Sequence, residues 1–239
     1  MRLDKYISEA LGLTRSQSRD LIRAGRVQVA GQVCKKADAA VEPETEVTAN
    51  GSSLRREEFV YVMVNKPLGV VSASTDRRDR AVVDLVGDAF PRRQLFPAGR
   101  LDKSSTGFVL LTDDGTFAHD ILSPAHHVSK TYSVLLDTPV TPEMVQGFAQ
   151  GVTLADGQTM KAARLLPHPA EPCRCTVVLT QGVYHQIKRM FGVFDAGVNE
   201  LHRLAIGGLA LDETLQPGEW KKLTKKDLEK LKRDDAGKE

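Results

Sequence analysis

The sequence contains little cysteine, no long apolar run and little net charge. Each of these shortages excludes a class of protein or removes an argument for one. Its 239 residues include three cysteines, so any disulfide scheme leaves one thiol unpaired, which is typical of a reducing compartment. No apolar run approaches the roughly 20 residues that span a membrane, and the first residues lack the pattern of a secretion signal. We therefore expect a cytoplasmic protein with no membrane partner. A formal net charge of +2 does not by itself indicate a nucleic-acid partner.

Motifs for nucleotide phosphates and metals are also missing. The sequence has no glycine-rich loop followed by Lys and Ser or Thr, and no repeat. Cys173 and Cys175 alternate with apolar residues, which predicts that both thiols lie on the buried face of one strand rather than in a zinc site. The neighbours His126 and His127 have no carboxylate or cysteine at ligand spacing, so we expect them to face RNA or solvent. These patterns predict no metal and no cofactor.

Residues 1–56 are predicted to form a small helix-hairpin unit. Apolar residues recur at helical spacing and stop at Gly12, and Thr14 with Gln17 has the pattern of a capping box for a second helix. Short alternating segments follow between Val27 and Val47. Basic residues outnumber acidic ones in the first part of this unit, which is typical of a phosphate-binding face, although a solvated helix face is the alternative. The basic residues concerned are Arg2, Lys5, Arg15, Arg19, Arg23 and Arg26.

Residues 52–58 lack apolar periodicity and are predicted to be a linker. The apolar run from Phe59 to Val64 then begins a second core, so we expect a larger domain over residues 59–239. Strands and helices do not alternate regularly along this part, which argues against a doubly wound parallel sheet. The predicted fold class is α+β, with the small module followed by a mostly antiparallel or mixed sheet flanked by helices.

The stretch Gly99–Gly107 is the strongest candidate for a reactive site. It holds one acid, one arginine and three hydroxyl residues, and an apolar strand ending in the turn pattern Asp114-Gly115 follows it. Such a strand would hold the loop, and with it Asp102, in a fixed position. The alternative is structural, because Asp in a glycine-flanked loop commonly bonds its own backbone to form a turn.

This loop resembles the nucleophile loop of pseudouridine synthases, in the family of ribosomal small-subunit pseudouridine synthase A and its large-subunit relatives. The similarity rests on Gly99-Arg100-Leu101-Asp102 and covers nearly the whole chain, because other blocks follow in the family's order. These blocks are Met63 to Gly69, Lys130 to Tyr132, Tyr184 to Met190, Leu201 to Arg203 and Ile206 to Gly208. The resemblance implies the pseudouridine synthase fold, with the active site in a cleft across the sheet.

The resemblance also implies catalytic roles for three residues. Asp102 matches the catalytic aspartate, and a carboxylate nucleophile needs neither metal nor redox cofactor. Tyr132 matches a tyrosine that stacks on the target base and is a candidate for removing the proton from its ring carbon. Lys188 matches the basic residue that pairs with the aspartate and offsets the effect of burial on its charge, with Arg189 as the alternative.

Other residues are expected to bind the substrate. Leu201 matches the family's apolar pocket residue, and Arg203 follows it in the same block. Arg100 either reaches into the nucleic acid or braces the loop, and one of the adjacent pair Lys188 and Arg189 is expected to contact phosphate. The N-terminal unit is similar to the S4 RNA-binding module, which implies that Arg15, Arg19, Arg23 and the Arg26 region face RNA.

The sequence therefore predicts a monomeric enzyme that isomerises uridine to pseudouridine in ribosomal RNA. The partner is expected to be ribosomal RNA or an assembly intermediate of the small subunit, because the blocks around the site look closer to the small-subunit enzyme. The target base must first leave its stack, which costs free energy. Binding of the surrounding RNA by a separate module would help to offset this cost. Two alternatives stay open: the same reaction on large-subunit RNA, and a non-catalytic ribosome-assembly factor that binds ribosomal RNA.

Overall fold

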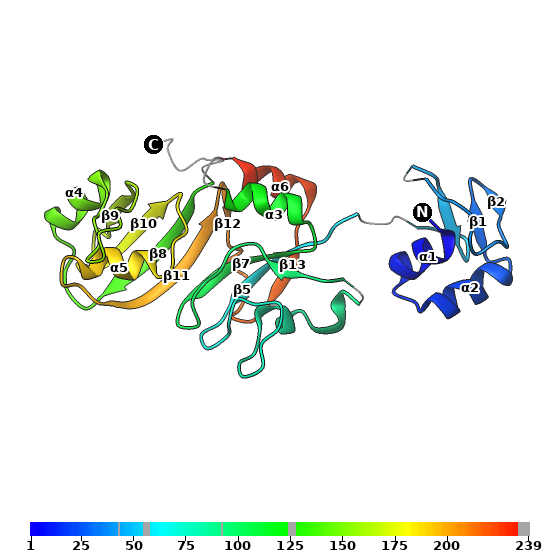
Figure 1. The fold of residues 1–239 in the computed structure, drawn as a ribbon, viewed down its shortest axis with the longest axis horizontal. Coiled ribbons are helices and arrows are strands. Elements are labelled where there is room, and N and C mark those ends of the chain that lie inside the picture. Colours follow the sequence, from blue (N-terminus) through cyan, green and yellow to red (C-terminus); the bar gives the residue numbers. More distant parts are fainter. Residues whose placement is uncertain (43, 55–57, 92, 124–127, 234–239) are drawn as a thin grey trace. The chain divides into compact units, whose positions relative to one another are not determined.

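The computed structural model describes residues 1–42, 44–54, 58–91, 93–123 and 128–233, and His126 and His127 therefore lie outside the described residues. The chain divides into two units (Figure 1), one of Met1–Phe59 with Asp88–Arg93 and one of Val60–Gly87 with Gln94–Glu239. Across the described ranges, no helix combines the length and apolar character needed to cross a membrane.

The first unit packs two helices against a small antiparallel sheet. The helices are α1 (Leu3–Leu11) and α2 (Arg15–Arg23), and the strands, in the order β2-β1-β3-β4, are β1 (Val27–Val29), β2 (Gln32–Val33), β3 (Val47–Ala49) and β4 (Ser52–Leu54). Gly12 ends α1 in the left-handed conformation, with a φ of 66°. The predicted capping box of α2 is confirmed, because Thr14 Oγ1 accepts from the Gln17 N–H at 3.1 Å and Gln17 Oε1 accepts from the Thr14 N–H at 2.8 Å.

The expectation that residues 52–58 form a linker is wrong for its first part. Ser52–Leu54 is strand β4, which pairs with β3 in an antiparallel register. The chain reverses at Asn50 and Gly51, whose φ values of 51° and 80° are those of a tight hairpin turn. Pairing across this turn, and not apolar periodicity, makes the polar segment a strand.

The second unit is built on one mixed sheet. Among the described residues, nine strands belong to it, and seven follow the order β13-β5-β7-β11-β8-β10-β9. They are β5 (Tyr61–Lys66), β7 (Thr106–Thr112), β8 (Lys130–Leu136), β9 (Arg164–Pro167), β10 (Arg174–Leu179), β11 (Val198–Ile206) and β13 (Trp220–Lys222), with β6 (Phe96–Pro97) on β7 and β12 (Leu209–Ala210) on β11. β11 runs parallel to β7, and the other described pairs are antiparallel. The predicted α+β class is confirmed.

Four helices cover this sheet in the described part of the chain: α3 (Gly115–Leu122), α4 (Pro142–Gln150), α5 (Gln186–Gly192) and α6 (Lys225–Lys232). The pattern Thr141-Pro142-Glu143 and the pair of Thr224 with Asp227 also predict helix starts. Both are confirmed, with Pro142 in the first turn of α4. Helices α3 and α6 lie side by side (Figure 1) and pack on one core cluster. Asp114-Gly115, predicted as a turn at the end of the strand, forms the start of α3. The Asp114 side chain caps α3 by accepting from the Phe117 N–H at 2.9 Å.

The prediction that Cys173 and Cys175 are both buried is correct for one of them. Cys175 is buried in β10, beside Val177 and Leu179 on the same face. Cys173 precedes β10 and is half-buried, and its carbonyl accepts from the Leu136 N–H at 2.8 Å. Both thiols are free, as is that of Cys34.

Candidate active site

The loop that carries Asp102 is pinned by backbone hydrogen bonds before it enters β7. The buried Ser72 hydroxyl donates to the Leu101 carbonyl at 2.9 Å and accepts from the Leu101 N–H at 3.0 Å. The Asp102 carbonyl accepts from the Ser105 N–H at 3.0 Å, and the Lys103 carbonyl accepts from the Gly69 N–H at 2.9 Å. The Asp102 side chain remains 26% exposed. The loop thus presents a reachable carboxylate in a fixed place.

Gly107 lets the strand after this loop approach β11 closely. It pairs with Arg203 in the parallel register, and its φ is 101°. A Cβ on Gly107 would lie 2.4 Å from the Arg203 carbonyl oxygen and 2.7 Å from its nitrogen. Only glycine fits here, and the close approach brings β11 next to the loop that carries Asp102.

Two cationic or polar side chains from the start of α5 face the Asp102 carboxylate. Lys188 Nζ lies 3.9 Å from Oδ2, and His185 Nε2 lies 3.3 Å from Oδ1. Lys188 also donates to Ser104 Oγ at 2.7 Å, which fixes the amine over the loop. The structure thus places Lys188 against Asp102, whereas Arg189 donates to Asp156.

Lys66 is a second lysine near Asp102, and sequence reasoning gave it no role. It ends β5, is fully buried, and donates from Nζ to the carbonyls of Pro67 at 3.0 Å and Val70 at 2.7 Å. Burial lowers the pKa of this amine to about 8, while the Asp102 carboxylate acts in the opposite direction. A lysine at the end of an otherwise apolar buried strand was the available signal, because lysine is rarely fully buried.

Tyr132, Arg203 and Gly107 form one row across three neighbouring strands. Arg203 of β11 pairs with Tyr132 of β8 on one side and with Gly107 of β7 on the other. Tyr132 and Leu201 are both buried, and Leu201 lies two residues before Arg203 and so on the same face of β11. The register therefore brings together the apolar, aromatic and basic residues that the sequence predicted for substrate binding.

The Arg203 guanidinium is buried, and part of its hydrogen-bonding capacity is unused. Nε donates to the Phe108 carbonyl at 2.6 Å, but Nη2 has no hydrogen-bond partner among the described residues. The next residue, His202, bonds Thr106 Oγ1 through Nδ1 at 2.8 Å. Burial lowers the pKa of His202, which favours a neutral ring. An unpaired buried cationic donor is costly, so Nη2 is suited to a polar partner that arrives with the substrate.

Arg100, which was also predicted to contact substrate, lies two residues before Asp102 and is exposed.

In the first unit, a buried carboxylate gathers three of the predicted RNA-facing arginines. Asp4 is inaccessible to solvent, and its oxygens lie 2.7 Å from Arg15 Nη2 and 3.3 Å from Nε of both Arg2 and Arg19. Burial alone would raise the Asp4 pKa, but the three guanidinium groups outweigh it and lower the pKa to about 2.

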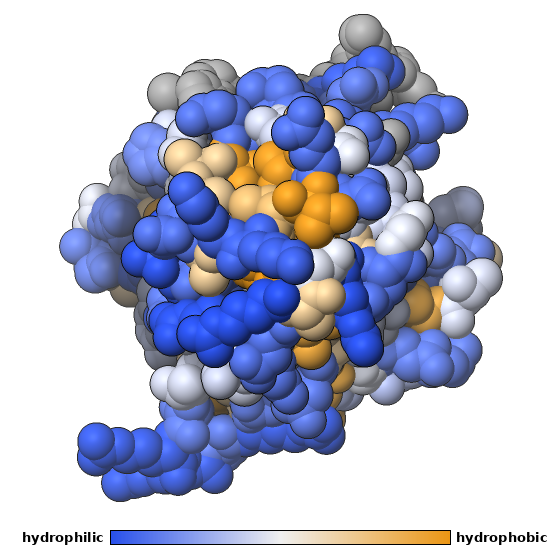
Figure 2. All heavy atoms as spheres, turned by 90° about the vertical axis from the view of Figure 1, so that its right-hand side faces the viewer, coloured by the Kyte–Doolittle hydropathy of each residue, from blue (hydrophilic) through white to orange (hydrophobic). Residues whose placement is uncertain are grey.

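The other three basic residues predicted to bind RNA, Lys5, Arg23 and Arg26, lie at the surface of this unit. Lys5 pairs with Glu9 at 3.8 Å and Arg23 with Asp20 at 3.7 Å, while Arg26 is exposed. Arg2, Arg15 and Arg19 also remain exposed over 41% to 56% of their side chains. Hydrophilic side chains cover much of the face of this unit in Figure 2, around a patch of apolar ones. The predicted basic residues therefore remain accessible to a ligand.

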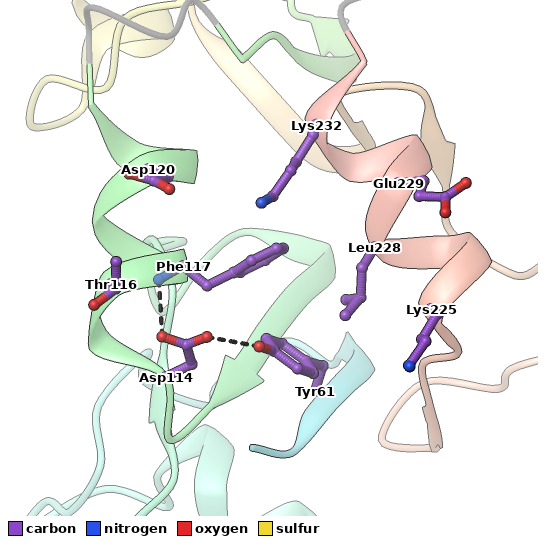
Figure 3. A pocket seen from close by; sticks show the side chains of 9 residues that line it. All are labelled: Tyr61, Asp114, Thr116, Phe117, Asp120, Lys225, Leu228, Glu229 and Lys232. Carbon is purple, nitrogen blue, oxygen red and sulfur yellow. Dashed lines mark hydrogen bonds between the residues drawn. The ribbon is translucent and has the colours of Figure 1, made fainter. Parts of the chain in front are cut away.

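A pocket of about 360 Å³ lies apart from these residues, between α3 and α6 (Figure 3). Asp114 accepts from the Tyr61 hydroxyl at 2.6 Å at its base, and Lys232 lies 5.1 Å from the centre of the Phe117 ring. No residue that the sequence singled out for catalysis or substrate binding lines it. The pocket is therefore separate from the site around Asp102.

Comparison with known families identifies the class of protein. Residues 60–192 match the family described as RNA pseudouridylate synthase, and residues 1–47 match the S4 domain. The chain belongs to the RNA pseudouridylate synthase family and carries an N-terminal S4 domain. It is an isomerase that converts uridine to pseudouridine in RNA, and its S4 domain binds RNA. The predicted family and reaction are confirmed.

Individual relatives extend over nearly the whole chain. Ribosomal small subunit pseudouridine synthase A of Escherichia coli (strain K12) is 40% identical over 95% of this chain and 98% of its own. An uncharacterized RNA pseudouridine synthase, YtzG, of Bacillus subtilis (strain 168) is 39% identical over 97% and 98%. A crystal structure of a pseudouridylate synthase, 38% identical, aligns with a TM-score of 0.68 over 97% of this chain and 99% of that one.

Proposed function

We propose that this enzyme isomerises a uridine of small-subunit ribosomal RNA with Asp102 as its nucleophile. The observation that carries the proposal is the fixed, accessible Asp102 carboxylate with Lys188 and His185 against it. In the reaction, the bond from the sugar to the base nitrogen breaks, the base rotates, and a bond from the sugar to ring carbon 5 forms. The proton lost from carbon 5 is balanced by one gained at the freed nitrogen, so no oxidant or reductant is required.

Neighbouring cations face the negative charge of the nucleophile. A positive charge within about 4 to 6 Å of a carboxylate attracts it electrostatically. Lys188 serves this role, with Lys66 contributing from the buried side. Arg189 is assigned to a phosphate, which would replace Asp156 as the partner of its guanidinium.

The row on β8 and β11 receives the flipped base. Tyr132 stacks on the uracil ring and is the candidate acceptor for the proton of carbon 5. Leu201 forms the apolar wall, and the unpartnered Arg203 Nη2 donates to a polar atom of the nucleotide. Arg100, exposed two residues before Asp102, contacts the surrounding RNA.

RNA binding is divided between two domains in this proposal. Residues 1–56 grip distant phosphates, and residues 59–239 carry the reaction. The cations of the first domain are the six predicted from the sequence: Arg2, Lys5, Arg15, Arg19, Arg23 and Arg26. Asp4 supports this assignment, because it gathers three arginines in one place and leaves them exposed.

The choice of the small subunit is supported by relatives named for that substrate at 40% to 41% identity over nearly the whole chain. Relatives of similar identity bear no substrate in their names, so large-subunit RNA is the competing outcome. The non-catalytic alternative receives no support, because the matched family is that of an enzyme.

The nucleophile is tested with Asp102→Asn, which keeps the shape of the side chain and removes its charge. Wild-type protein releases tritium from RNA labelled at uridine carbon 5, and we expect the variant to release none while its affinity for the RNA persists. Turnover by a preparation shown by mass spectrometry to be free of deamidation would refute the role of Asp102.

The substrate is tested separately. Unmodified small-subunit and large-subunit particles, and their naked RNAs, are treated in parallel with wild-type protein and mapped by carbodiimide-blocked reverse transcription. We expect one new stop in small-subunit RNA. A stop found solely in large-subunit RNA would overturn the substrate and leave the Asp102 chemistry intact.

A further inference from the structure

Tyr184 is an exposed aromatic residue at the edge of the site. It is 75% exposed, which is more than any other large hydrophobic residue in the described part of the chain. Its ring stacks on that of His185, with centroids 3.8 Å apart and an interplanar angle of 19°. One face of Tyr184 is therefore covered by His185, and the exposure of the residue leaves the opposite face open.

His185 joins this stack to the catalytic carboxylate, since its Nε2 lies 3.3 Å from Asp102 Oδ1. Its φ of 50° is left-handed, a conformation that a residue other than glycine adopts in a small minority of cases and that clusters at functional sites. The two stacked rings thus extend from the carboxylate to the solvent.

The turn that presents the two rings is held by the buried side chain of Gln186. Gln186 Oε1 accepts from the Val183 N–H at 3.2 Å, and the Gln186 N–H donates to the Val183 carbonyl at 3.1 Å. Gln186 Nε2 donates to Gln181 Oε1 at 3.2 Å, which ties the turn to the end of β10. The rings are therefore fixed by hydrogen bonds on both sides of the turn, as a preformed binding surface requires.

We propose that Tyr184 is a stacking platform for the base of a nucleotide next to the target uridine. The stack of Tyr184 on His185 has nearly the spacing of roughly 3.4 Å that separates nucleotides along a strand. When the target uridine enters the site at Asp102, a neighbouring base loses its stacking partner, and the open face of Tyr184 replaces it. Lys103, which follows Asp102 in the chain and pairs with Asp79, is an exposed cation available to the same strand.

A nucleobase fits this surface better than a protein side chain does. Every base has an aromatic face, so a flat exposed ring beside cations is the recurring arrangement for single-stranded nucleic acid. The platform lies against the residue to which catalysis is assigned, where RNA must already be present. The proposal rests on the proposed function in this one respect.

The test uses full-length protein and an RNA from which the wild type releases tritium, whichever ribosomal subunit it represents. The fluorescent base 2-aminopurine replaces the nucleotide on one or the other side of the target uridine. Binding is measured in the Asp102→Asn background, where no turnover is expected, and steady-state kinetics in the wild-type background. The variants are Tyr184→Ala and Tyr184→Phe, with Leu166→Ala on β9 as a control at another exposed hydrophobic side chain, 44% exposed.

We expect Tyr184→Ala to raise Kd and KM about 5- to 100-fold with kcat unchanged, the range that base stacking on an aromatic ring provides. Quenching of 2-aminopurine at one flanking position should be lost with it. Tyr184→Phe keeps the ring, and Leu166→Ala lies elsewhere, so both should behave as the parent protein. Thermal unfolding checks that all variants fold.

Three results would overturn the platform. One is equal quenching and affinity for Tyr184→Ala and the parent protein. Another is a fall in kcat with KM and quenching unchanged, which would make Tyr184 a positioning residue for His185. The third is a defect seen with assembled particles and not with naked RNA, which would assign the surface to a protein partner. Turnover by Asp102→Asn would instead overturn the proposed nucleophile, a separate result.

Discussion

At Lys66, burial disfavours the positive charge of the amine, whereas the proposed support of Asp102 requires that charge. The Lys66 side chain is fully buried and its amine has a pKa of about 8, below the ordinary 10.5, because burial favours the neutral form. Between these two values the unfolded chain binds more protons at Lys66 than the folded chain does. Its contribution to stability therefore rises with pH across the window from about 8 to 10.5. In the folded protein, the positive charge that it offers to Asp102 is lost as the pH rises through about 8.

This opposition predicts the alkaline behaviour of the enzyme. We expect the single-turnover rate of isomerisation to fall as the pH rises through about 8, while the protein stays folded. RNA affinity, measured at each pH, separates a loss of chemistry from a loss of binding. A rate that stays level between pH 7 and 9.5 would show that the Lys66 charge does not assist Asp102.

Gly107 gives a second prediction for a single residue. A methyl group there meets the Arg203 backbone at 2.4 Å and also stands at a φ of 101°, so we expect Gly107→Ala to lower the free energy of unfolding by roughly 2 to 5 kcal/mol. Gly157→Ala is the matched control, because Gly157 has a φ of 82° with nothing within 4 Å of an added Cβ. Denaturant unfolding compares the two variants. Equal effects would show that the conformation, and not the contact with β11, requires glycine.

At the scale of the elements, α1 and α2 are tied together by the buried carboxylate of Asp4. The Asp4 pKa of about 2 lies below its ordinary 3.8, so the unfolded chain binds more protons between these values and stability rises with pH across them. This contribution, about 2 kcal/mol, is fully present above pH 4 and is lost as the pH falls through 2.

Asp4→Asn should remove this pH dependence. We expect the variant to be less stable than the wild type at pH 7 and the difference to disappear as the pH approaches 2. Thermal unfolding of full-length protein over pH 2 to 7 measures it, with Asp20→Asn as the control for an exposed ion pair, that with Arg23. A difference that does not change with pH would show that the arginine contacts do not stabilise the charged form of Asp4.

Local signals made some elements predictable, and distant pairing decided the rest. The helix starts at Thr14, Thr141 and Thr224 depend on residues within three positions, so the sequence was sufficient. Strand β4 depends on β3, and its polar residues gave no periodicity to detect. The site divides similarly. Its motif residues were recognisable, but the burial of Lys66 and the placement of Lys188 rather than Arg189 against Asp102 are set by how distant segments pack.

At the scale of the whole molecule, the S4 domain precedes the sheet that carries the reaction. Removing residues 1–56 should leave a folded enzyme with weaker RNA binding and a smaller dependence on salt, because each phosphate contact with single-stranded RNA contributes about −0.7 to the slope of log K against log salt. Affinity measured at several salt concentrations, for the truncated and full-length proteins, checks this. Identical slopes would mean that the arginines around Asp4 contact no phosphate.

The parallel pairing of β7 with β11 also sets when the enzyme becomes active during its own synthesis. Ser104 bonds a residue 84 positions later, Phe108 one 95 positions later and Thr106 one 96 positions later. A ribosome that adds about 5 to 20 residues per second takes about 5 to 20 seconds to make such a segment. The nascent chain therefore possesses its S4 domain and the proposed nucleophile loop well before the strand that completes the proposed active site. Catalytic competence is acquired late, when nearly all of the chain has been made.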